Sequence, residues 1–345
     1  MARTTMRAYQ LRQAGQMPDV VELAIPEPGP RQVRLRMAGA GLCHSDLLVI
    51  NASPSYYPLP LIMGHEATGW IDAVGAQVQG LNLGDAYGVY FPWGCGHCAP
   101  CSHGAENICD TSAQTPGFAT GRDGGMAEYF IVDDPRHLVA LGDIDPVAAA
   151  PLMCAGITAY HAVEQSGHVL VSGATAVVIG VGGLGHIAIQ ILKARTAARI
   201  IAVDTQQAKL DHARSLGADA TVLAGPDAAD AIRRATGGLG AAAVLDFVGN
   251  DRTLELGSKV LAQGGMLQII GVGGGTLPIR FHEMPRDTSV TLPYAGTISD
   301  LRGVVDLAAA GRLAPDVLRI GFDQLNDTYQ LMDSGKLKGR AVLVP

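Results

Sequence analysis

A short apolar strand followed by three spaced glycines most constrains how this chain folds. Residues 175–193 read TAVVIGVGGLGHIAIQILK, in which Gly180, Gly182 and Gly185 spell G-x-G-x-x-G between a predicted buried strand and an amphipathic helix. The first glycine of this pattern permits a tight turn, the second lets backbone approach a pyrophosphate, and the third lets helix and strand pack closely. Free N–H groups at the helix N-terminus then favour phosphate. We therefore predict a dinucleotide-binding turn.

An acidic residue further along the chain supports this prediction. The predicted strand 199–203 ends at Asp204, which lies 19 residues beyond Gly185. This spacing is close to the roughly 20 residues expected of the acid that binds the ribose hydroxyls. A carboxylate there repels a 2′-phosphate, and the next residues, TQQ, include no arginine to hold one. The pattern favours NAD over NADP, against the alternative of an α/β turn that binds no nucleotide.

Six cysteines include four at metal-ligand spacing, C-x2-C-x2-C-x7-C, at Cys95, Cys98, Cys101 and Cys109. Three disulfides are the alternative for six cysteines, but four within 15 residues favour a metal. Four thiolates suit a closed tetrahedral zinc site that stabilises a loop. An iron–sulfur run would read C-x2-C-x2-C-x3-C-P, whereas the last gap here is seven and Asp110 follows. His97 lies inside the loop, where an exposed position is a simpler interpretation than a fifth ligand.

A second group of metal-ligand residues is spread along the chain. Cys43 lies in GLCHSD, His65 in GHE and Cys154 in PLMCAG. Singly, a buried cysteine usually behaves as a small hydrophobic residue. Together, two thiolates and an imidazole match the known ligands of the catalytic zinc in alcohol dehydrogenases and leave a fourth position open, an assignment made by analogy. Asp46 is suited by type to fix the tautomer of His65.

Length and composition limit the remaining possibilities. The 345 residues suffice for two domains, and 48% hydrophobic with 17% charged residues describes a globular protein. A net charge of −7 without a basic run argues against nucleic acid and anionic membranes as partners. The N-terminus lacks the apolar region of a signal peptide, and no window of 18 residues is uninterruptedly apolar. We expect a cytoplasmic protein.

The order of predicted elements indicates an α/β protein with two domains. Short strands separated by Gly and Pro read as an irregular β domain, at 6–11, 32–38, 66–74, 86–90 and 126–132. Helices and strands then alternate as in a doubly wound parallel sheet, with strands at 177–179, 200–203, 221–223, 242–247, 266–271 and 290–294. Helices are expected near 206–216, 227–236, 251–262 and 299–310, and a last strand at 341–344 returns to the β domain.

With these motifs in place, the chain resembles the zinc-dependent medium-chain alcohol dehydrogenases over nearly its whole length. The resemblance rests on GLCHSD, GHE followed by Gly69, the four-cysteine loop, PLMCAG, GVGGLG and the closing KGRAVLVP. Among members the chain is most similar to bacterial NAD-dependent secondary-alcohol dehydrogenases. The resemblance implies a GroES-like catalytic domain at 1–153 and 295–345 with a zinc lobe at 95–109. It also implies a Rossmann domain at 154–294 and two zinc ions per subunit.

The resemblance also implies roles for individual residues. Cys43, His65 and Cys154 would hold the catalytic zinc, Glu66 could enter the metal's shell, and Ser45 would hydrogen-bond the substrate hydroxyl, with Asp46 behind His65. The implied cofactor residues are His44, Thr158, Gly180, Gly182, Gly183, Leu184, Gly185, Asp204, Lys209, Phe247, Val248, Gly271, Val272 and Arg340, the last reaching the pyrophosphate. The implied substrate pocket is apolar and partly aromatic, drawn from Leu48, Tyr57, Trp93, Phe118, Tyr294 and Ala295.

An uncharged pocket predicts medium-sized aliphatic or aryl-alkyl secondary alcohols and their ketones as substrates. One departure concerns proton release: several relatives have a histidine six residues after the first zinc-ligand cysteine, where this chain reads Leu48-Val49-Ile50. The proton relay must then end on water, the ribose or His44. In relatives the last sheet strand pairs across a two-fold axis, so strand 290–294 predicts a homodimer or a homotetramer of dimers.

Three rival interpretations remain open. A polyol or diol dehydrogenase would keep GHE and the cysteine loop, although many polyol relatives have glutamate at the position of Cys154. A structural or regulatory protein that binds NAD without catalysis would keep the fold alone. A zinc-loop interaction module would explain only residues 95–109.

Overall fold

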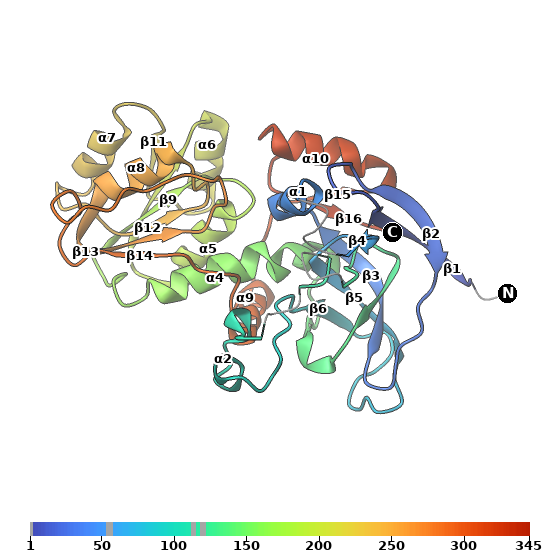
Figure 1. The fold of residues 1–345 in the computed structure, drawn as a ribbon. Helices are drawn as coiled ribbons and strands as arrows, with labels where there is room; N and C mark the ends of the chain where they lie inside the picture. Colours follow the sequence, from blue (N-terminus) through green and yellow to red (C-terminus); the bar gives the residue numbers. More distant parts are fainter. Residues whose placement is uncertain (1–2, 53–57, 112–114, 118–121) are drawn as a thin grey trace. The chain divides into compact units, whose positions relative to one another are not determined.

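The computed structural model describes residues 3–52, 58–111, 115–117 and 122–345 (Figure 1). The chain divides into two compact units. The first comprises Met1–Cys154, Thr297–Ala309 and Ala314–Pro345, and the second comprises Ala155–Gly296 and Ala310–Leu313. Together they confirm the predicted α/β fold class with a parallel sheet and a separate, mainly antiparallel β unit.

The second unit is built on a six-stranded parallel sheet of order β11-β10-β9-β12-β13-β14. The strands are β9 Thr175–Ile179, β10 Arg199–Asp204, β11 Ala220–Leu223, β12 Ala241–Asp246, β13 Leu261–Ile269 and β14 Ser289–Thr291. Every residue of β9 is buried because the strand lies in the middle of the sheet. Strand order reverses between β9 and β12, and such a switch point is where open α/β sheets bind ligands.

Helices connect the parallel strands, as the alternating pattern predicts. They are α4 Ala155–Gln165, α5 Gly185–Arg195, α6 Gln207–Ser215, α7 Ala228–Ala235 and α8 Asp251–Val260. Gly217 lies just past α6 with φ +108°, a conformation that glycine adopts without strain. The core of this unit is aliphatic, with Val177, Ile201 and Val244 fully buried.

The first unit contains a seven-stranded sheet and a three-stranded sheet. The larger has the order β15-β16-β3-β5-β6-β8 with β7 also paired to β3, and its strands are β3 Val33–Gly41, β5 Glu66–Val74, β6 Ala86–Val89, β7 Tyr129–Val132, β8 Leu138–Ala140, β15 Val317–Ile320 and β16 Arg340–Leu343. The smaller joins β2 Asp19–Ala24, β1 Thr5–Leu11 and β4 Leu61–Ile62. Because β16 pairs antiparallel with β3, the C-terminal segment does return to the β unit, as predicted.

Short helices fill the connections of the first unit. They are α1 His44–Ile50, α2 Ala99–Ser102, α3 Pro146–Ala149, α9 Ile298–Ala309 and α10 Leu325–Asp333, with 3₁₀ turns at Glu106–Ile108, Pro135–His137, Ala150–Met153 and Phe322–Gln324. Among the described residues no single helix is long and apolar enough to cross a membrane. The consecutive segments Pro146–Met153 and Ala155–Gln165 pass that test as a pair, by length and composition only.

Several boundaries differ from the prediction for physical reasons. Strand β5 matches the predicted 66–74, and its first four residues are all buried. Strand β2 was not predicted, since it is an edge strand whose side chains are half-buried or exposed. Helix α8 ends at Val260 and β13 begins at Leu261, so the predicted helix runs two residues too far.

Candidate functional site

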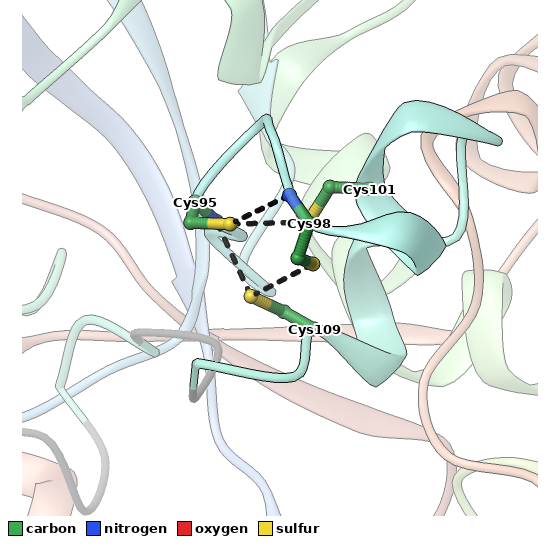
Figure 2. A group of neighbouring side chains, drawn as sticks. All are labelled: Cys95, Cys98, Cys101 and Cys109. Atoms are coloured by element: carbon green, nitrogen blue, oxygen red, sulfur yellow. Dashed lines mark hydrogen bonds between the residues drawn. The ribbon is translucent and has the colours of Figure 1, made fainter.

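The four cysteines of residues 95–109 converge on one point, as Figure 2 shows. Their sulfurs all lie within 4.8 Å of one another, with Sγ–Sγ distances of 4.0 Å for Cys95–Cys101 and 3.8 Å for Cys98–Cys109. All four are free thiols, so no disulfide competes. Four sulfurs about 2.3 Å from one tetrahedral zinc ion stand about 3.8 Å apart. The spacing therefore fits a single zinc ion.

The protonation of this cluster also calls for a cation. The hydroxyl of Thr111 and backbone N–H groups lower the pKa of Cys95 to about 5, whereas burial raises the pKa of Cys101 to about 12. Sulfurs this close cannot all be ionised without a compensating positive charge, which a divalent metal supplies. The backbone N–H groups of Cys95 and Cys98 donate to the sulfurs of Cys109 and Cys95, both at 3.3 Å. The loop is thus prepared for four thiolates.

A second cluster is assembled from three distant parts of the first unit. Cys43 precedes α1, His65 and Glu66 stand at the start of β5, and Cys154 follows the 3₁₀ turn Ala150–Met153. One ligand atom from each lies within 4.8 Å of the others, and all four residues are buried. Asp46 holds the first of them in place by accepting a 2.8 Å hydrogen bond from the backbone N–H of Cys43.

The charges around this cluster favour a metal ligand set. Hydrogen bonding from Cys154 lowers the pKa of Cys43 well below its usual value, and the same contact raises the pKa of Cys154. Burial lowers the pKa of His65, but Asp46 and Cys43 outweigh burial and raise it well above its usual value. Asp46 Oδ1 lies 3.2 Å from His65 Nδ1, which leaves Nε2 to face the cysteines. The two cysteines then share one proton, and the imidazole carries a further one. A bound dication would displace both protons.

Glu66 completes the cluster through a fully buried ion pair. Arg340 Nη2, from β16, contacts Glu66 Oε1, and both side chains are at most 3% exposed. Burial raises the pKa of Glu66 to about 7, although Arg340 opposes this shift. Glu66 Oε2 has no hydrogen-bond partner among the described residues. An orphaned buried carboxylate oxygen beside two cysteines and a histidine fits a site that accepts a cation.

Glycine at position 41 makes room for this ion pair. A Cβ atom on Gly41 would stand 2.1 Å from Glu66 Oε2 and 3.0 Å from Glu66 Cβ. Gly41 pairs with Glu66 across β3 and β5, so neither backbone can withdraw. Only glycine permits the carboxylate to occupy this position.

In the second unit the glycine loop has the form that its sequence predicts. Gly180 has φ +87°, and a Cβ on Gly185 would lie 1.9 Å from Gly180 O, so α5 approaches β9 too closely for any other residue. Apart from Gly182 and its two chain neighbours, no described atom lies within 4 Å of where a Cβ on Gly182 would stand, which leaves backbone open to a ligand. Asp204 Oδ2 accepts the backbone N–H of Val181 at 2.8 Å, so the acid is joined to the loop. These features fit a dinucleotide.

The remaining predicted cofactor residues occupy varied positions. Thr158 is buried on α4, Lys209 is half-buried on α6, and Val272 is 61% exposed after β13. Gly183, Leu184, Phe247, Val248 and Gly271 are half-buried near the ends of β9, β12 and β13. His44 is exposed at the start of α1, and Ser45 Oγ lies 3.0 Å from Cys43 Sγ. Arg340, expected at the pyrophosphate, is buried against Glu66, and its cofactor role stays a prediction.

The predicted substrate pocket is only partly described. Trp93 is buried, its Nε1–H donates to Tyr90 O at 2.7 Å, and its ring stacks on His137 with centroids 5.0 Å apart. Leu48 and Tyr294 are 50% and 47% exposed, and Ala295 is buried with φ +51°. Tyr57 and Phe118 lie outside the described residues. These contacts leave the pocket assignment as a prediction.

Two residues near the second cluster were assigned no such contact from the sequence. Tyr329 donates to Asp46 Oδ2 at 2.8 Å although 283 residues separate them. The pairing of Arg340 with Glu66 spans 274 residues. No local motif marks either contact, and only paired substitutions across related chains would carry a signal.

Two known families match this chain in succession. Residues 29–143 match "Alcohol dehydrogenase GroES-like domain" and residues 183–310 match "Zinc-binding dehydrogenase". An NAD-dependent alcohol dehydrogenase from Sulfurisphaera tokodaii is 36% identical, covering 99% of this chain and 100% of that protein. A D-arabinose 1-dehydrogenase (NADP(+)) from Saccharolobus solfataricus is 34% identical, covering 98% of this chain and 97% of that protein.

A solved structure shows the same likeness in three dimensions. The alcohol dehydrogenase from Aeropyrum pernix superposes with a TM-score of 0.91 at 34% sequence identity. The match covers 98% of this chain and 100% of that one. Sequence and fold therefore agree over essentially the whole length of both chains.

Proposed function

Since the chain belongs to the zinc-type medium-chain alcohol dehydrogenases, it is an NAD-dependent alcohol oxidoreductase, and we propose that it prefers apolar secondary alcohols. The observation that carries the assignment is the buried convergence of Cys43, His65, Glu66 and Cys154. The cofactors are zinc and NAD. The bound partner is a small-molecule alcohol or ketone.

We assign the two zinc sites by their donor sets. Cys43, His65 and Cys154 are the proposed ligands of the catalytic zinc, with Glu66 as a neighbour whose Oε2 is available. The four-cysteine lobe is the proposed structural zinc site, because four thiolates close a tetrahedron and leave no position for substrate. The three-ligand site leaves one.

The proposed mechanism follows from which residues can hold a proton. When bound, zinc polarises the substrate oxygen and NAD accepts the hydride. Ser45 Oγ, which lies 3.0 Å from Cys43 Sγ, would accept the proton of the substrate hydroxyl while its own hydroxyl proton passes on to the cofactor ribose or to water. His44 follows Cys43 directly and is exposed to solvent, so we place the end of the proton relay there. Asp46 holds both Cys43 and His65 in place during the reaction.

Cofactor preference rests on Asp204. Its carboxylate stands at the end of β10 and is joined by hydrogen bonds to Val181 N and Gln206 N, at 2.8 and 3.0 Å. A fixed carboxylate suits the ribose hydroxyls of NAD and opposes the extra phosphate of NADP. The relative from Saccharolobus solfataricus is named for NADP(+), so cofactor preference is tested directly below.

A comparison of substrates under one set of conditions tests the proposal. We expect the highest kcat/KM with 2-butanol and NAD, when 1-butanol, 2,3-butanediol and D-arabinose are assayed at equal concentration with NAD and NADP. Preference for the diol or for D-arabinose would favour the polyol or sugar alternative, which the name of one relative supports. No turnover from protein that holds two zinc ions per chain would reject all four substrates.

We also propose that the chain forms a homodimer or a tetramer of dimers. Strand β14 is an edge strand of its sheet, and an edge is free to pair with its copy across a two-fold axis. The neighbouring segment is apolar and exposed in the single chain, with Ile279 at 63%, Phe281 at 91% and Leu292 at 75%. Light scattering that gives the mass of one chain would reject this proposal.

A further inference from the structure

The C-terminal helix α10 reaches the metal cluster through one buried hydroxyl. Tyr329 is 1% exposed, and its hydroxyl donates to Asp46 Oδ2 at 2.8 Å. Helices α1 and α10 pack against each other within the first unit, so this contact joins two elements from opposite ends of the sequence. The hydrogen bonds that the structure gives the Tyr329 hydroxyl go to Asp46 and to the sulfur of Met126, and not to a proposed zinc ligand.

The two carboxylate oxygens of Asp46 contact different partners. Oδ2 accepts from the backbone N–H of Cys43 and from the hydroxyl of Tyr329, both at 2.8 Å, while Oδ1 faces His65 Nδ1 at 3.2 Å. A carboxylate held by two donors on one oxygen cannot rotate freely, so its other oxygen keeps a fixed direction. A carboxylate behind a zinc-bound histidine favours the tautomer with its proton on the nitrogen nearest the carboxylate, which is Nδ1 here.

The tyrosine is itself held by its neighbours. Tyr9, from β1, stacks on the Tyr329 ring with centroids 6.1 Å apart and planes 11° from parallel. The hydroxyl of Tyr9 donates to Asn326 Oδ1, one turn before Tyr329 on α10. Both rings are buried, and the Tyr329 hydroxyl and Asp46 are buried together, so this hydroxyl cannot readily exchange its partner for bulk water.

We propose that Tyr329 is a positioning residue for the catalytic zinc, acting through Asp46 on His65. This inference rests on the proposed ligand set and extends it by one contact. Tyr329 keeps the imidazole in the tautomer and orientation that bind the metal, so its effect is on zinc retention before it is on turnover. Loss of a carboxylate behind a zinc-bound histidine lowers metal affinity roughly 10- to 100-fold, and we expect a smaller effect one contact further away.

Zinc release from the holoenzyme to a coloured chelator tests the proposal without any substrate. Tyr329→Phe should speed release of the buried zinc roughly three- to tenfold and leave release from the four-cysteine lobe unchanged. The matched control is Tyr9→Phe, which removes one buried hydroxyl from the same stacked pair but none from Asp46. With cobalt in the buried site, Tyr329→Phe should also shift the visible absorption bands, which report ligand geometry.

A double-mutant cycle separates positioning from general loosening. If Tyr329 acts through Asp46, adding Tyr329→Phe to Asp46→Ala, which leaves no oxygen to accept from the tyrosine, should speed zinc release no further. Equal release from Tyr329→Phe and Tyr9→Phe, or full additivity in the cycle, would overturn the inference while leaving the proposed ligands intact. Wild-type protein that holds zinc only in the lobe would instead overturn the ligand set, and the inference with it.

Discussion

The two cysteine-containing sites of this chain bring thiols together in opposite ways. The lobe draws all its ligands from residues 95–109, and three of its four cysteines are only half-buried. The buried cluster draws ligands from residues 43, 65, 66 and 154, and all four are buried. The lobe is therefore a local structure that four thiolates close, whereas the buried cluster exists only when the whole β unit has folded.

The two sites also differ in the charged residues that lie behind their ligands. The lobe offers four sulfurs and nothing else to a metal. The buried cluster adds Asp46 behind His65 and Arg340 behind Glu66. In the described part of the chain, one oxygen of Glu66 has no hydrogen-bond partner. Outer partners of this kind orient ligands and tune their basicity, which a reacting metal requires and a structural one does not. The comparison predicts that damage to one site should spare the other.

The largest effect should come from removing a ligand of the buried cluster. In Cys154→Ala we expect kcat/KM to fall by more than about 10³-fold, because a lost ligand exceeds the 10- to 100-fold cost of a lost outer partner. Zinc content should drop from two ions to one per chain, measured by atomic absorption, while the lobe zinc remains. Retained activity at one zinc per chain would show that the catalytic metal lies elsewhere.

Removing one cysteine ligand from the lobe should affect stability and spare the chemistry. Cys98→Ser should lower the free energy of unfolding by roughly 3 kcal/mol or more, a fraction of the ~10–16 kcal/mol that zinc supplies to zinc-finger peptides. The freshly folded variant should keep kcat within a factor of about three, because the lobe offers no position for substrate. Denaturant unfolding and initial rates measured together would contradict this if both fell equally.

Sequence reasoning found the two sites unequally, and the reason is physical. The four lobe cysteines lie within 15 residues, so their spacing in the sequence is enough to indicate that they can reach one metal ion. The spacing of Cys43, His65 and Cys154 in the sequence does not indicate that they lie close in space. They were grouped only by resemblance to a family. The contacts of Tyr329 and Arg340 were out of reach, because they depend on where β16 and α10 return. Buried central strands such as β9 were predicted well, and the edge strand β2 was not.

A third prediction concerns the room that Gly41 leaves at the buried cluster. In Gly41→Ala the new methyl group would stand 2.1 Å from Glu66 Oε2, in a buried ion pair that cannot withdraw. We expect a loss of roughly 2–4 kcal/mol in the free energy of unfolding, together with weaker retention of the buried zinc. The matched control is Gly225→Ala, where no described atom beyond the chain neighbours lies within 4 Å of the new Cβ. Its free energy of unfolding should change by less than about 0.5 kcal/mol. Equal losses of unfolding free energy in both variants would show that the contact with Glu66 is not the cause.

The smallest effect belongs to His137, which lies beside the lobe and against Trp93. Burial lowers the pKa of His137 to about 3, and Arg136 adds to the effect. Neither ring nitrogen has a hydrogen-bond partner among the described residues, and Glu106 Oε2 lies 3.7 Å from Nε2. The folded protein therefore holds this ring neutral, whereas the unfolded chain protonates it below about pH 6.5.

The sign of the pH dependence follows from these two pKa values. The stability that His137 contributes is complete above about pH 6.5 and is lost as pH falls toward 3, because only the unfolded state takes up the proton. At pH 4 the loss is at most roughly 3 kcal/mol, because burial and Arg136 together outweigh the opposing charge of Asp134. His137→Phe keeps a ring against Trp93 and has no proton to gain. Between pH 7 and pH 4 its free energy of unfolding should therefore fall less than that of the wild-type protein, and the difference should equal this loss. The free energy of unfolding of both proteins is measured by urea unfolding at each pH. Parallel pH profiles would mean that His137 is protonated in the folded state as well.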